Sequence, residues 1–391
     1  MKNIPRCLAL ATWIAASATM APTAHATNPP RDGGNPFANA AFYIDANYAA
    51  QVESSAAASP SDAALLRKAA AYPTAVWLTS VGDVPTARRT LDAAAVQERR
   101  AGKPLVVAFA LYDLPGRDCS AAASHGELAA DDAGVRRYEA EFIDPIAAAI
   151  HAHPKTRVVV FVEPDSLANI ATNLKVPACA QAEHAYRASI AYAIRTLALP
   201  NASIYVDAGH AGWLGWNGNR VAIAKVFAEV LADAGGADKI RGFVTNVSNY
   251  DSLDTGDLAR LAPSDPAKGE LSYVRLLDAS LAAVGIAGKR FVVDTGRNGR
   301  AGLRTDPGSW CNVRGAGLGE RPRANPDDLV DAYFWIKPPG QSDGGSDPGG
   351  AGFDPQCGGP HAADSAGGAP PAGQWFHAYF VALAKNASPP L

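Results

Sequence analysis

Short apolar, β-branched or aromatic runs recur along the chain and alternate with longer stretches of helical spacing. The short runs are Ala75–Thr79, Leu105–Leu111, Val158–Val162, Ile204–Val206, Phe243–Val244, Phe291–Val293 and Tyr333–Ile336. The longer stretches are rich in alanine and include Ala63–Ala71, Ala87–Arg100, Gly134–His151, Ala180–Leu197 and Asn219–Ala234. Strands that alternate with helices indicate a parallel sheet with helical crossovers. The pattern therefore predicts an α/β fold, an incomplete parallel β/α barrel of about seven strands, rather than a sandwich.

Polar residues gather directly after these predicted strands. In chain order they are Tyr112, Asp113 and Asp118; Glu163 and Asp165; Asp207 and His210; Asn246 and Asn249; Asp294 and Arg297; Lys337 and Asp343. The opposite strand ends show no such concentration. Because the carboxyl ends of barrel strands meet at one mouth, we expect an active site there.

The chain begins with the features of a secretory signal. Lys2 and Arg6 precede a largely apolar run from Leu8 to Ala18, and Ala24-His25-Ala26 is a small-residue cleavage site. We therefore expect a signal peptide at 1–26, a short leader at 27–34 and a single catalytic domain at 35–391, secreted after cleavage near Ala26.

Composition excludes several classes of protein. A hydrophobic fraction of 48% with 19% charged residues excludes a disordered chain. The net charge of −3 leaves no basic patch for nucleic acid, and no later apolar run is long enough for a bilayer. Four cysteines remain after the signal, which allows three pairings, and none has the spacing of a metal site. We expect a monomer that needs no metal or cofactor.

Three carboxylates lie in loops that contain glycine or proline: Asp118, Asp165 and Asp343. Glycosidic hydrolysis needs one protonated and one ionised carboxyl group, and crowding of like charges raises the pKa of one of them. The alternative is that these residues cap helices. For Asp165, which Ser-Leu-Ala-Asn follows, composition alone favours capping.

The tryptophans fall into two groups. Trp213, Trp216 and Trp310 lie among glycines and polar residues in loops after strands, where stacking on sugar rings and core packing are equally favoured. Trp77 and Trp335 lie inside apolar runs, which favours the core. The segment from Pro338 to Gly373 has no periodic element, and a loop of this length indicates function.

Six sequence blocks resemble glycoside hydrolase family 6, the inverting cellulases. They are YDLPGRDC from Tyr112, VEPDSLANIATN from Val162, DAGHAGWLGW from Asp207, TNVSNY from Thr245, WCN from Trp310 and WIKPPGQSDG from Trp335. The resemblance extends from Asn35 to Phe376. It implies a distorted, incomplete β/α barrel that cleaves β-1,4-glucan with inversion and uses no cofactor.

The resemblance also implies roles for individual residues. Asp165 matches the general acid, Asp118 the carboxylate that raises the pKa of this acid and organises the attacking water, and Asp343 the proposed base. Tyr112 and Ser124 match residues of the cleavage subsite. The implied substrate contacts are Trp213, Trp216 and Trp310 as sugar platforms, with His210, Asn249 and Lys337 as polar partners of hydroxyl groups. The implied disulfides are Cys119–Cys179 and Cys311–Cys357.

Two positions depart from the family pattern. Gln341 stands where the family usually has Glu, which removes a negative charge beside Lys337, and Phe42 and Tyr43 stand near a usual Trp. We keep Gln341 and Tyr43 as expected substrate contacts.

Loop lengths bear on the mode of attack. Long loops after Asp118 and Asp343 resemble those that roof the cleft in chain-end enzymes, which favours a cellobiohydrolase. An endoglucanase is the first alternative. A non-catalytic carbohydrate-binding protein is less favoured because all three carboxylates are present.

Overall fold

The computed structural model describes residue 1 and residues 34–359 and 362–391. The predicted signal peptide, apart from Met1, and the leader up to residue 33 lie outside the described residues. The strands are β1 (Ala41–Phe42), β2 (Val76–Leu78), β3 (Leu105–Leu111), β4 (Arg157–Val162), β5 (Ala202–Asp207), β6 (Gly242–Thr245), β7 (Arg290–Asp294), β8 (Arg323–Asp327) and β9 (Val330–Phe334). They form one sheet in the order β1-β3-β4-β5-β6-β7-β9-β8, with β2 also paired to β3.

All seven predicted strands are present, and the pairs among them are parallel, as expected. The pattern missed β1 and β8. β1 has two residues, too few to show periodicity. β8 is antiparallel to β9 and contains Asn325-Pro326, which is typical of a turn, and its pairing with β9 shifts register at that point.

The barrel is incomplete at the seam between β2 and β9. There an isolated bridge joins Thr74 to Trp335, and the Trp77 indole Nε1–H donates to the carbonyl of Ile336 at 2.8 Å. Aromatic rings fill the interior of the curled sheet. Phe37 is buried among the rings of Tyr205 and Phe334, with centroid distances of 6.3 and 5.9 Å. The segment before β1 therefore plugs the open barrel.

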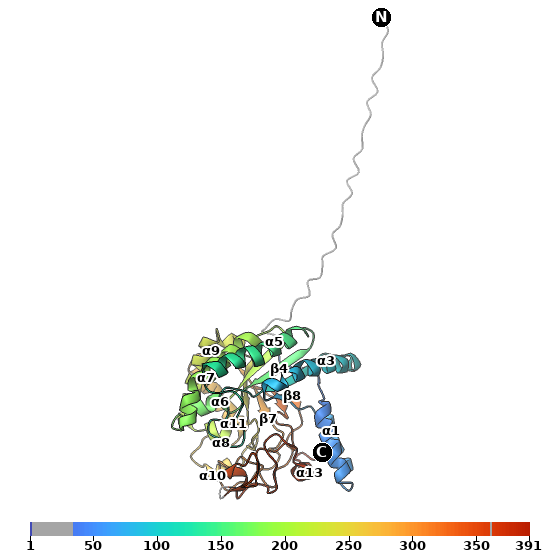
Figure 1. Ribbon diagram of the computed structural model, residues 1–391, viewed down its shortest axis with the longest axis vertical. Coiled ribbons are helices and arrows are strands. Elements are labelled where there is room, and N and C mark those ends of the chain that lie inside the picture. The colour runs from blue at the N-terminus through green and yellow to red at the C-terminus, as the bar shows by residue number, and fades with distance from the viewer. Residues whose placement is uncertain (2–33, 360–361) are drawn as a thin grey trace.

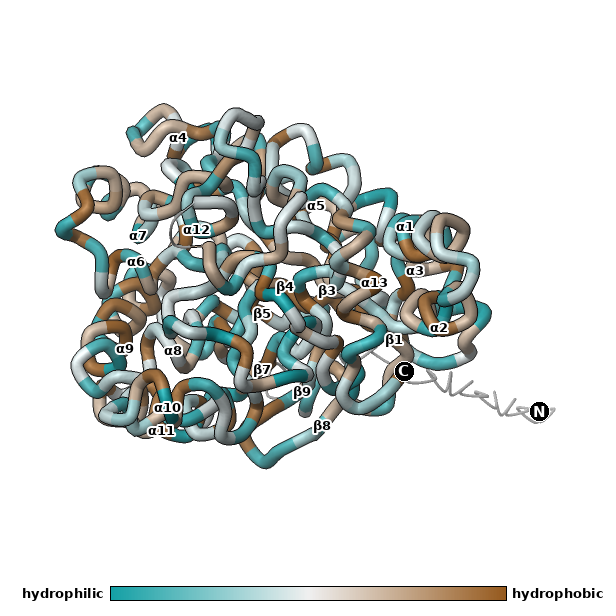
Figure 2. Tube along the Cα trace, turned by 90° about the horizontal axis from the view of Figure 1, so that it is seen from below, coloured by the Kyte–Doolittle hydropathy of each residue, from teal (hydrophilic) through white to brown (hydrophobic). Residues whose placement is uncertain are grey.

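Helices cover the outer face of the sheet and pack on it through a second, larger core. The principal ones are α1 (Ala46–Ala58), α3 (Val84–Ala101), α5 (Asp144–His151), α6 (Ser166–Thr172), α7 (Pro177–Leu197), α9 (Asn217–Asp233), α11 (Glu270–Ala282) and α13 (His377–Lys385). The shorter ones are α2 (Ala63–Arg67), η1 (Lys68–Ala71), η2 (Val81–Asp83), α4 (Asp132–Arg137), η3 (Tyr138–Ile143), α8 (Ala211–Leu214), η4 (Ala237–Lys239), α10 (Leu258–Leu261) and α12 (Pro355–Gly358). Figure 2 shows the strands at the centre, with α6, α7 and α9 on one side and α1, α2 and α3 on the other.

The long loops gather at one end of the molecule. In Figure 1 the red C-terminal loop lies with α10 and α13, at the end opposite α5 and α9. Disulfides join Cys119 to Cys179 and Cys311 to Cys357, with Cα–Cα distances of 4.8 and 5.2 Å, which confirms the expected pairing. No helix of the described residues is long and apolar enough to cross a membrane.

Candidate active site

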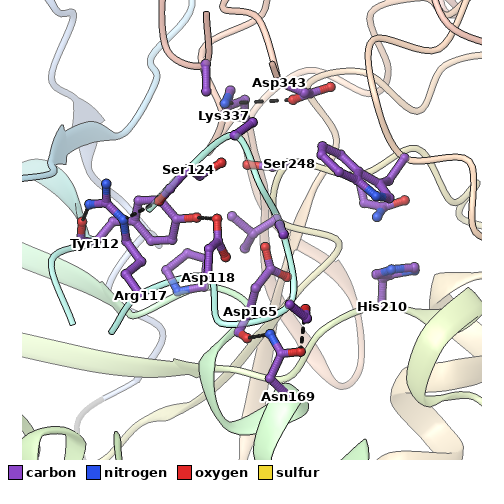
Figure 3. Close-up of a pocket in the computed structure, with 18 of the residues that line it drawn as sticks. Tyr112, Arg117, Asp118, Ser124, Asp165, Asn169, His210, Ser248, Lys337 and Asp343 are labelled. Atoms are coloured by element: carbon purple, nitrogen blue, oxygen red, sulfur yellow. Dashed lines mark hydrogen bonds and ion pairs between the residues drawn. The ribbon is translucent and has the colours of Figure 1, made fainter. Parts of the chain in front are cut away.

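A cavity of about 610 Å³ opens at the carboxyl ends of the strands. Figure 3 shows the side chains that converge on it from loops far apart in the sequence. The sequence-predicted residues that line it are Tyr112, Asp118, Ser124, Asp165, His210, Trp213, Asn249, Trp310, Lys337, Gln341 and Asp343. The structure therefore brings together most of the expected site, drawn from the loops after six different strands.

The backbone at this mouth adopts a conformation that L-residues rarely use. Asp118, Glu163, Asp165 and Ser248 have φ values of 56°, 49°, 61° and 59°. A positive φ costs about 1–3 kcal/mol at a residue other than glycine and persists where the surroundings hold it. The tertiary structure thus fixes the direction of three carboxyl-bearing residues against a local preference.

Asp165 occupies the N-cap position of α6, but its side chain makes no capping hydrogen bond. The capping role that composition favours is therefore wrong. Its backbone N–H donates to Asp207 Oδ2 at 3.1 Å, and Asn169 Nδ2 donates to its carbonyl at 2.6 Å. Burial and the charges of Asp207 and Asp118 raise the pKa of Asp165 well above its usual range. Asp165 lines the cavity, and its surroundings favour the protonated form of its carboxyl.

Asp118 faces the same space and has different partners. The Tyr112 hydroxyl donates to Asp118 Oδ2, and the Arg117 guanidinium lies 4.4 Å from the centroid of the Tyr112 ring. Burial raises the pKa of Asp118, while the Tyr112 hydrogen bond, Arg117 and Ser124 oppose the rise. Its ionised form therefore has stabilising partners on the protein side.

A buried acidic pair joins the ends of β3 and β4 beneath these residues. The Glu163 carboxylate accepts hydrogen bonds from the backbone N–H groups of Asp113 and Leu114 at 3.3 and 3.2 Å and from the hydroxyl of Tyr138 at 2.8 Å. Burial is the main cause that raises the pKa of Glu163 to about 7 and that of Asp113 to about 8. Tyr138 comes from the π-helical turn η3, a feature often found near functional sites.

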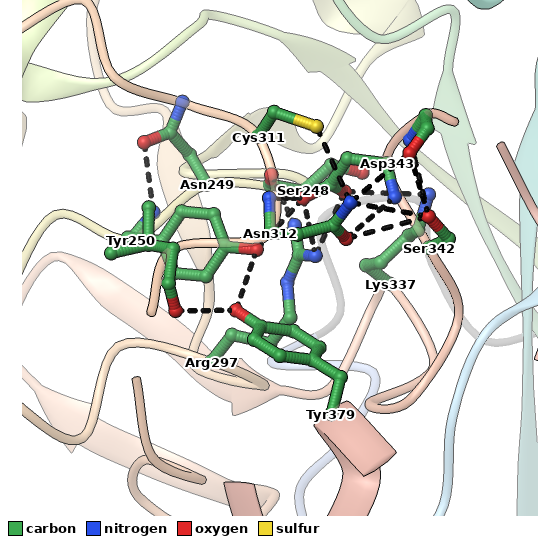
Figure 4. A network of polar contacts seen from close by, with 12 residues as sticks. Ser248, Asn249, Tyr250, Arg297, Cys311, Asn312, Lys337, Ser342, Asp343 and Tyr379 are labelled. Carbon is green, nitrogen blue, oxygen red and sulfur yellow. Dashed lines mark hydrogen bonds and ion pairs between the residues drawn. The ribbon is translucent and has the colours of Figure 1, made fainter. Parts of the chain in front are cut away.

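Asp343 is held by cationic and neutral donors (Figure 4). Arg297 Nη1 lies 2.8 Å from both carboxylate oxygens, and the Tyr250 hydroxyl and the Asn312 backbone N–H donate to Oδ2 at 2.7 and 2.8 Å. Lys337 Nζ lies 3.8 Å from Oδ1. This carboxylate is therefore the anionic centre of a buried network, and most of its acceptor capacity is used.

His210 and Trp213 form the far wall of the cavity. His210 Nδ1 lies 2.7 Å from Asp251 Oδ2, an arrangement that leaves Nε2 free for a substrate hydroxyl. Asp251 is paired with the buried Arg304, which holds the pKa of Asp251 well below its usual range. The Trp213 indole N–H donates to Thr172 Oγ1 at 3.0 Å, which fixes the plane of its ring.

Two aromatic predictions need revision, and a third stays a prediction. Tyr43 is 6% exposed and packs in the core behind the sheet, with its N–H bonded to the carbonyl of Val106, so it is not available to substrate. Trp216 is partly exposed, like Trp213, and lies outside the lining of this cavity, so its role as a sugar platform stays a prediction. Trp77, expected in the core, lines the cavity because β2 stands at the open seam, and Lys337 Nζ lies 5.5 Å from its ring centroid.

Sequence reasoning missed other lining residues. Arg117 and Asn169 each lie close in sequence to a carboxylate, and Ser248 is in the TNVSNY block. Asn169 follows Asp165 by four residues, so helical spacing could have placed both on one face. Arg117 and Ser248 carry no such signal, because their positions depend on how separate loops pack. Within the described part of the chain, no group of three or more His, Cys, Asp or Glu side chains could hold a metal ion.

The half-barrel and its paired carboxyls define a glycoside hydrolase, and the comparisons with known proteins agree. The model of the family described as glycosyl hydrolases family 6 matches residues 37–387, and the chain belongs to this family. This confirms the expected family and the expected class of enzyme.

Individual relatives cover nearly the whole described domain. The chain is 41% identical to "1,4-beta-D-glucan cellobiohydrolase C" of Emericella nidulans, over 91% of this chain and 79% of the relative. It is 40% identical to "Putative endoglucanase type B" of Fusarium oxysporum, over 91% and 77%. The solved catalytic core of the cellobiohydrolase Cel6A from Chaetomium thermophilum is 39% identical, with a TM-score of 0.87 over 92% of this chain and 100% of that chain.

Proposed function

We propose that the protein is a secreted cellobiohydrolase that releases cellobiose from chain ends of β-1,4-glucan with inversion. The observation that carries the proposal is that Asp165, whose pKa is raised by burial and by neighbouring carboxyls, lines one cavity with Asp118 and with Trp77, Trp213 and Trp310. The rings offer flat apolar faces, and His210 and Asn249 offer polar groups for hydroxyls. The glucan is the sole partner we propose, and the catalytic domain at 35–391 acts as a monomer.

Asp165 acts as the general acid. Bond cleavage requires a proton on the leaving oxygen, and a carboxyl that neighbouring anions keep neutral can supply it. Delivery of the proton leaves Asp165 ionised beside Asp118, which is unfavourable until the proton returns. This repulsion supports rapid reprotonation before the next cycle.

Asp118 and Ser124 line the same cavity as Asp165. As the oxygen of the attacking water bonds to the anomeric carbon, the water gives up a proton, and we assign Asp118, whose ionised form Tyr112 and Arg117 stabilise, to accept it. Ser124 helps to orient this water. The contacts of Asp343 favour an electrostatic role over direct proton abstraction. A base must have a free lone pair directed at the water, whereas Arg297, Tyr250 and Asn312 already occupy this carboxylate. We assign Asp343 the task of holding Lys337 and Arg297 beside the sugar-binding surface.

Chain-end attack is supported by two segments that border the cavity. We name residues 118–125 the first roof segment and residues 343–358 the second roof segment. The first contributes several residues to the lining and the second contributes Asp343, and each contains one cysteine of a disulfide. A roofed site holds the chain between cuts, so cellobiose should dominate, because alternate glucose units face opposite ways. An endoglucanase is the second candidate, favoured by the Fusarium relative's name.

Secretion is supported by the N-terminal sequence pattern and by the two disulfides, which persist in oxidising compartments. N-terminal sequencing of the protein recovered from culture medium should begin near Thr27. Retention of an uncut chain inside the cell would contradict this part of the proposal.

Two measurements test the activity. Hydrolysis of cellohexaose followed by NMR should give α-anomeric product first, with cellobiose dominant. Viscosity loss of carboxymethylcellulose should be slow relative to the reducing ends released. A β-anomeric first product would overturn inversion, and a steep early loss of viscosity would establish the endoglucanase instead. Absence of any cleavage would leave a binding protein.

A further inference from the structure

The tip of the first roof segment is fixed on one side by several contacts. The Cys119–Cys179 disulfide holds its start, and Ser120 Oγ donates to Asn169 Oδ1 on α6 at 2.8 Å. Arg117 Nε donates to the carbonyl of Ser124 at 2.8 Å and closes the loop on itself. These contacts hold the two ends of the segment. Its middle, around Ala122, is held by a contact from the opposite side.

Asp354 supplies that contact across 232 sequence positions. Its Oδ2 accepts the backbone N–H of Ala122 at 3.0 Å. Its Oδ1 accepts the N–H of Gln356 at 2.8 Å and so caps the short helix α12, which the Cys311–Cys357 disulfide ties to the barrel. Asp354 is 3% exposed, so its hydrogen bonds are protected from water.

A second contact lies beside it. A Cβ atom built on Gly344 would lie 3.0 Å from the Cβ of Ala123 and 2.8 Å from Cys357 Sγ, so the two roof segments touch closely there. This contact is steric and adds little attraction. The hydrogen bond from Ala122 to Asp354 is therefore the polar contact between the two segments, and a hydrogen bond to a charged acceptor is among the stronger kinds.

We propose that Asp354 is a specificity-determining latch that keeps the roof closed and so sets the ratio of chain-end to internal attack. It does not line the cavity, and it acts by positioning the first roof segment. This inference rests on the proposed function, since internal attack requires a glucanase site. Loss of one such hydrogen bond shifts an opening equilibrium by roughly tenfold.

The test uses two variants that remove the same bond from opposite ends. Asp354→Ala removes the acceptor together with the cap of α12. Ala122→Pro removes the donor and leaves the cap intact. Asp347→Ala is the matched control, because Asp347 is exposed on the same segment and bonds within its own turn, to Gly349 at 3.1 Å.

For both latch variants we expect viscosity loss per reducing end to rise by roughly tenfold, with the rate on cellotetraose unchanged within about threefold. The double variant should be no more endo-active than either single variant, because both remove one interaction. Thermal unfolding verifies that each variant is folded. Variants that match Asp347→Ala in the viscosity ratio would overturn the latch.

Hydrogen exchange separates failure of the latch from failure of the proposed function. In the folded Asp354→Ala variant, a peptide that contains Ala122 should exchange roughly tenfold faster than in the unaltered protein, whatever the mode of attack. Unchanged exchange would overturn the inference. If the unaltered protein itself thins carboxymethylcellulose steeply, the chain-end function fails, and the exchange rate alone decides whether Asp354 holds the segments together.

Discussion

Asp165 and Asp343 both line the cavity, but different kinds of side chain surround the two carboxyl groups. Burial is the largest cause that raises the pKa of Asp165, and the neighbouring carboxyls of Asp207 and Asp118 raise it further. Asp343 is surrounded by Arg297, by the Lys337 ammonium and by neutral donors such as the Tyr250 hydroxyl. The first environment raises the pKa of its carboxyl, and the second pairs its carboxylate with a guanidinium and an ammonium group.

The difference shows that burial alone does not decide what a carboxyl does. Crowded like charges keep one acid neutral, so it can donate a proton. A buried anion with a paired guanidinium is stabilised as a charge and organises its neighbours. Both residues are aspartates in loops directly after strands, so their roles depend on partners brought by distant segments.

The largest effect should come from removing the proton that Asp165 donates. Asp165→Asn preserves shape but cannot donate, so we expect turnover of cellotetraose to fall by about 10²–10⁴. A dinitrophenyl cellobioside should lose far less, because its leaving group departs without protonation. Initial rates on both substrates measure the effect. Near-normal cleavage of cellotetraose by this variant would refute the assignment of Asp165.

The contribution of the Arg297–Asp343 pair is tested through the free energy of unfolding. Arg297→Met leaves the Asp343 carboxylate buried without its guanidinium, and we expect the free energy of unfolding to fall by about 3–5 kcal/mol. The control is Arg323→Met, which removes an exposed pair with Glu320 at 3.6 Å and should cost about 0–1 kcal/mol. Denaturant titration compares the two. Equal losses would mean that the buried network contributes no more than a surface pair.

Much of the fold could be predicted from sequence. The seven interior strands are continuous apolar runs, and all were found, whereas β8 contains Asn325-Pro326 and lies at an edge. Helices α1, α11 and α13 were missed. Among these, α1 and α11 mix apolar and polar residues, as is usual for helices that pack only part of their surface on a neighbour.

The site divides in the same way. Residues inside the recognised blocks, such as Asp165 and Trp213, line the cavity as expected. Trp77 was misplaced because an apolar run does not reveal whether its ring faces the seam or the core. Tyr43 was expected at the site only because the family usually has a Trp near its position, and it packs in the core. The resemblance implied the effect of Asp118 on the pKa of Asp165, but the effect of Asp207 could not be read from sequence, since Asp207 acts from another strand.

The smallest effect should come from removing a single charge beside Asp165, that of Asp207. Asp207 Oδ2 accepts both the Asp165 N–H at 3.1 Å and the Gly209 N–H at 3.0 Å. In Asp207→Asn the amide oxygen can keep both bonds, so only the charge is lost. Burial raises the pKa of Asp207 to about 7, so its charge is present chiefly above that pH.

The sign of the effect follows from the direction of the coupling. The Asp207 anion disfavours ionisation of Asp165 and raises its pKa, so removal of the charge lowers the pKa of Asp165. Activity needs protonated Asp165 and is lost as pH rises through this pKa. The alkaline limb of kcat against pH on cellotetraose should therefore move to lower pH in Asp207→Asn, while Asp347→Asn, on the exposed roof segment, should leave it in place. A limb that stays fixed, or moves to higher pH, would mean that Asp165 is kept protonated by burial alone and that the contrast with Asp343 does not depend on neighbouring carboxyls.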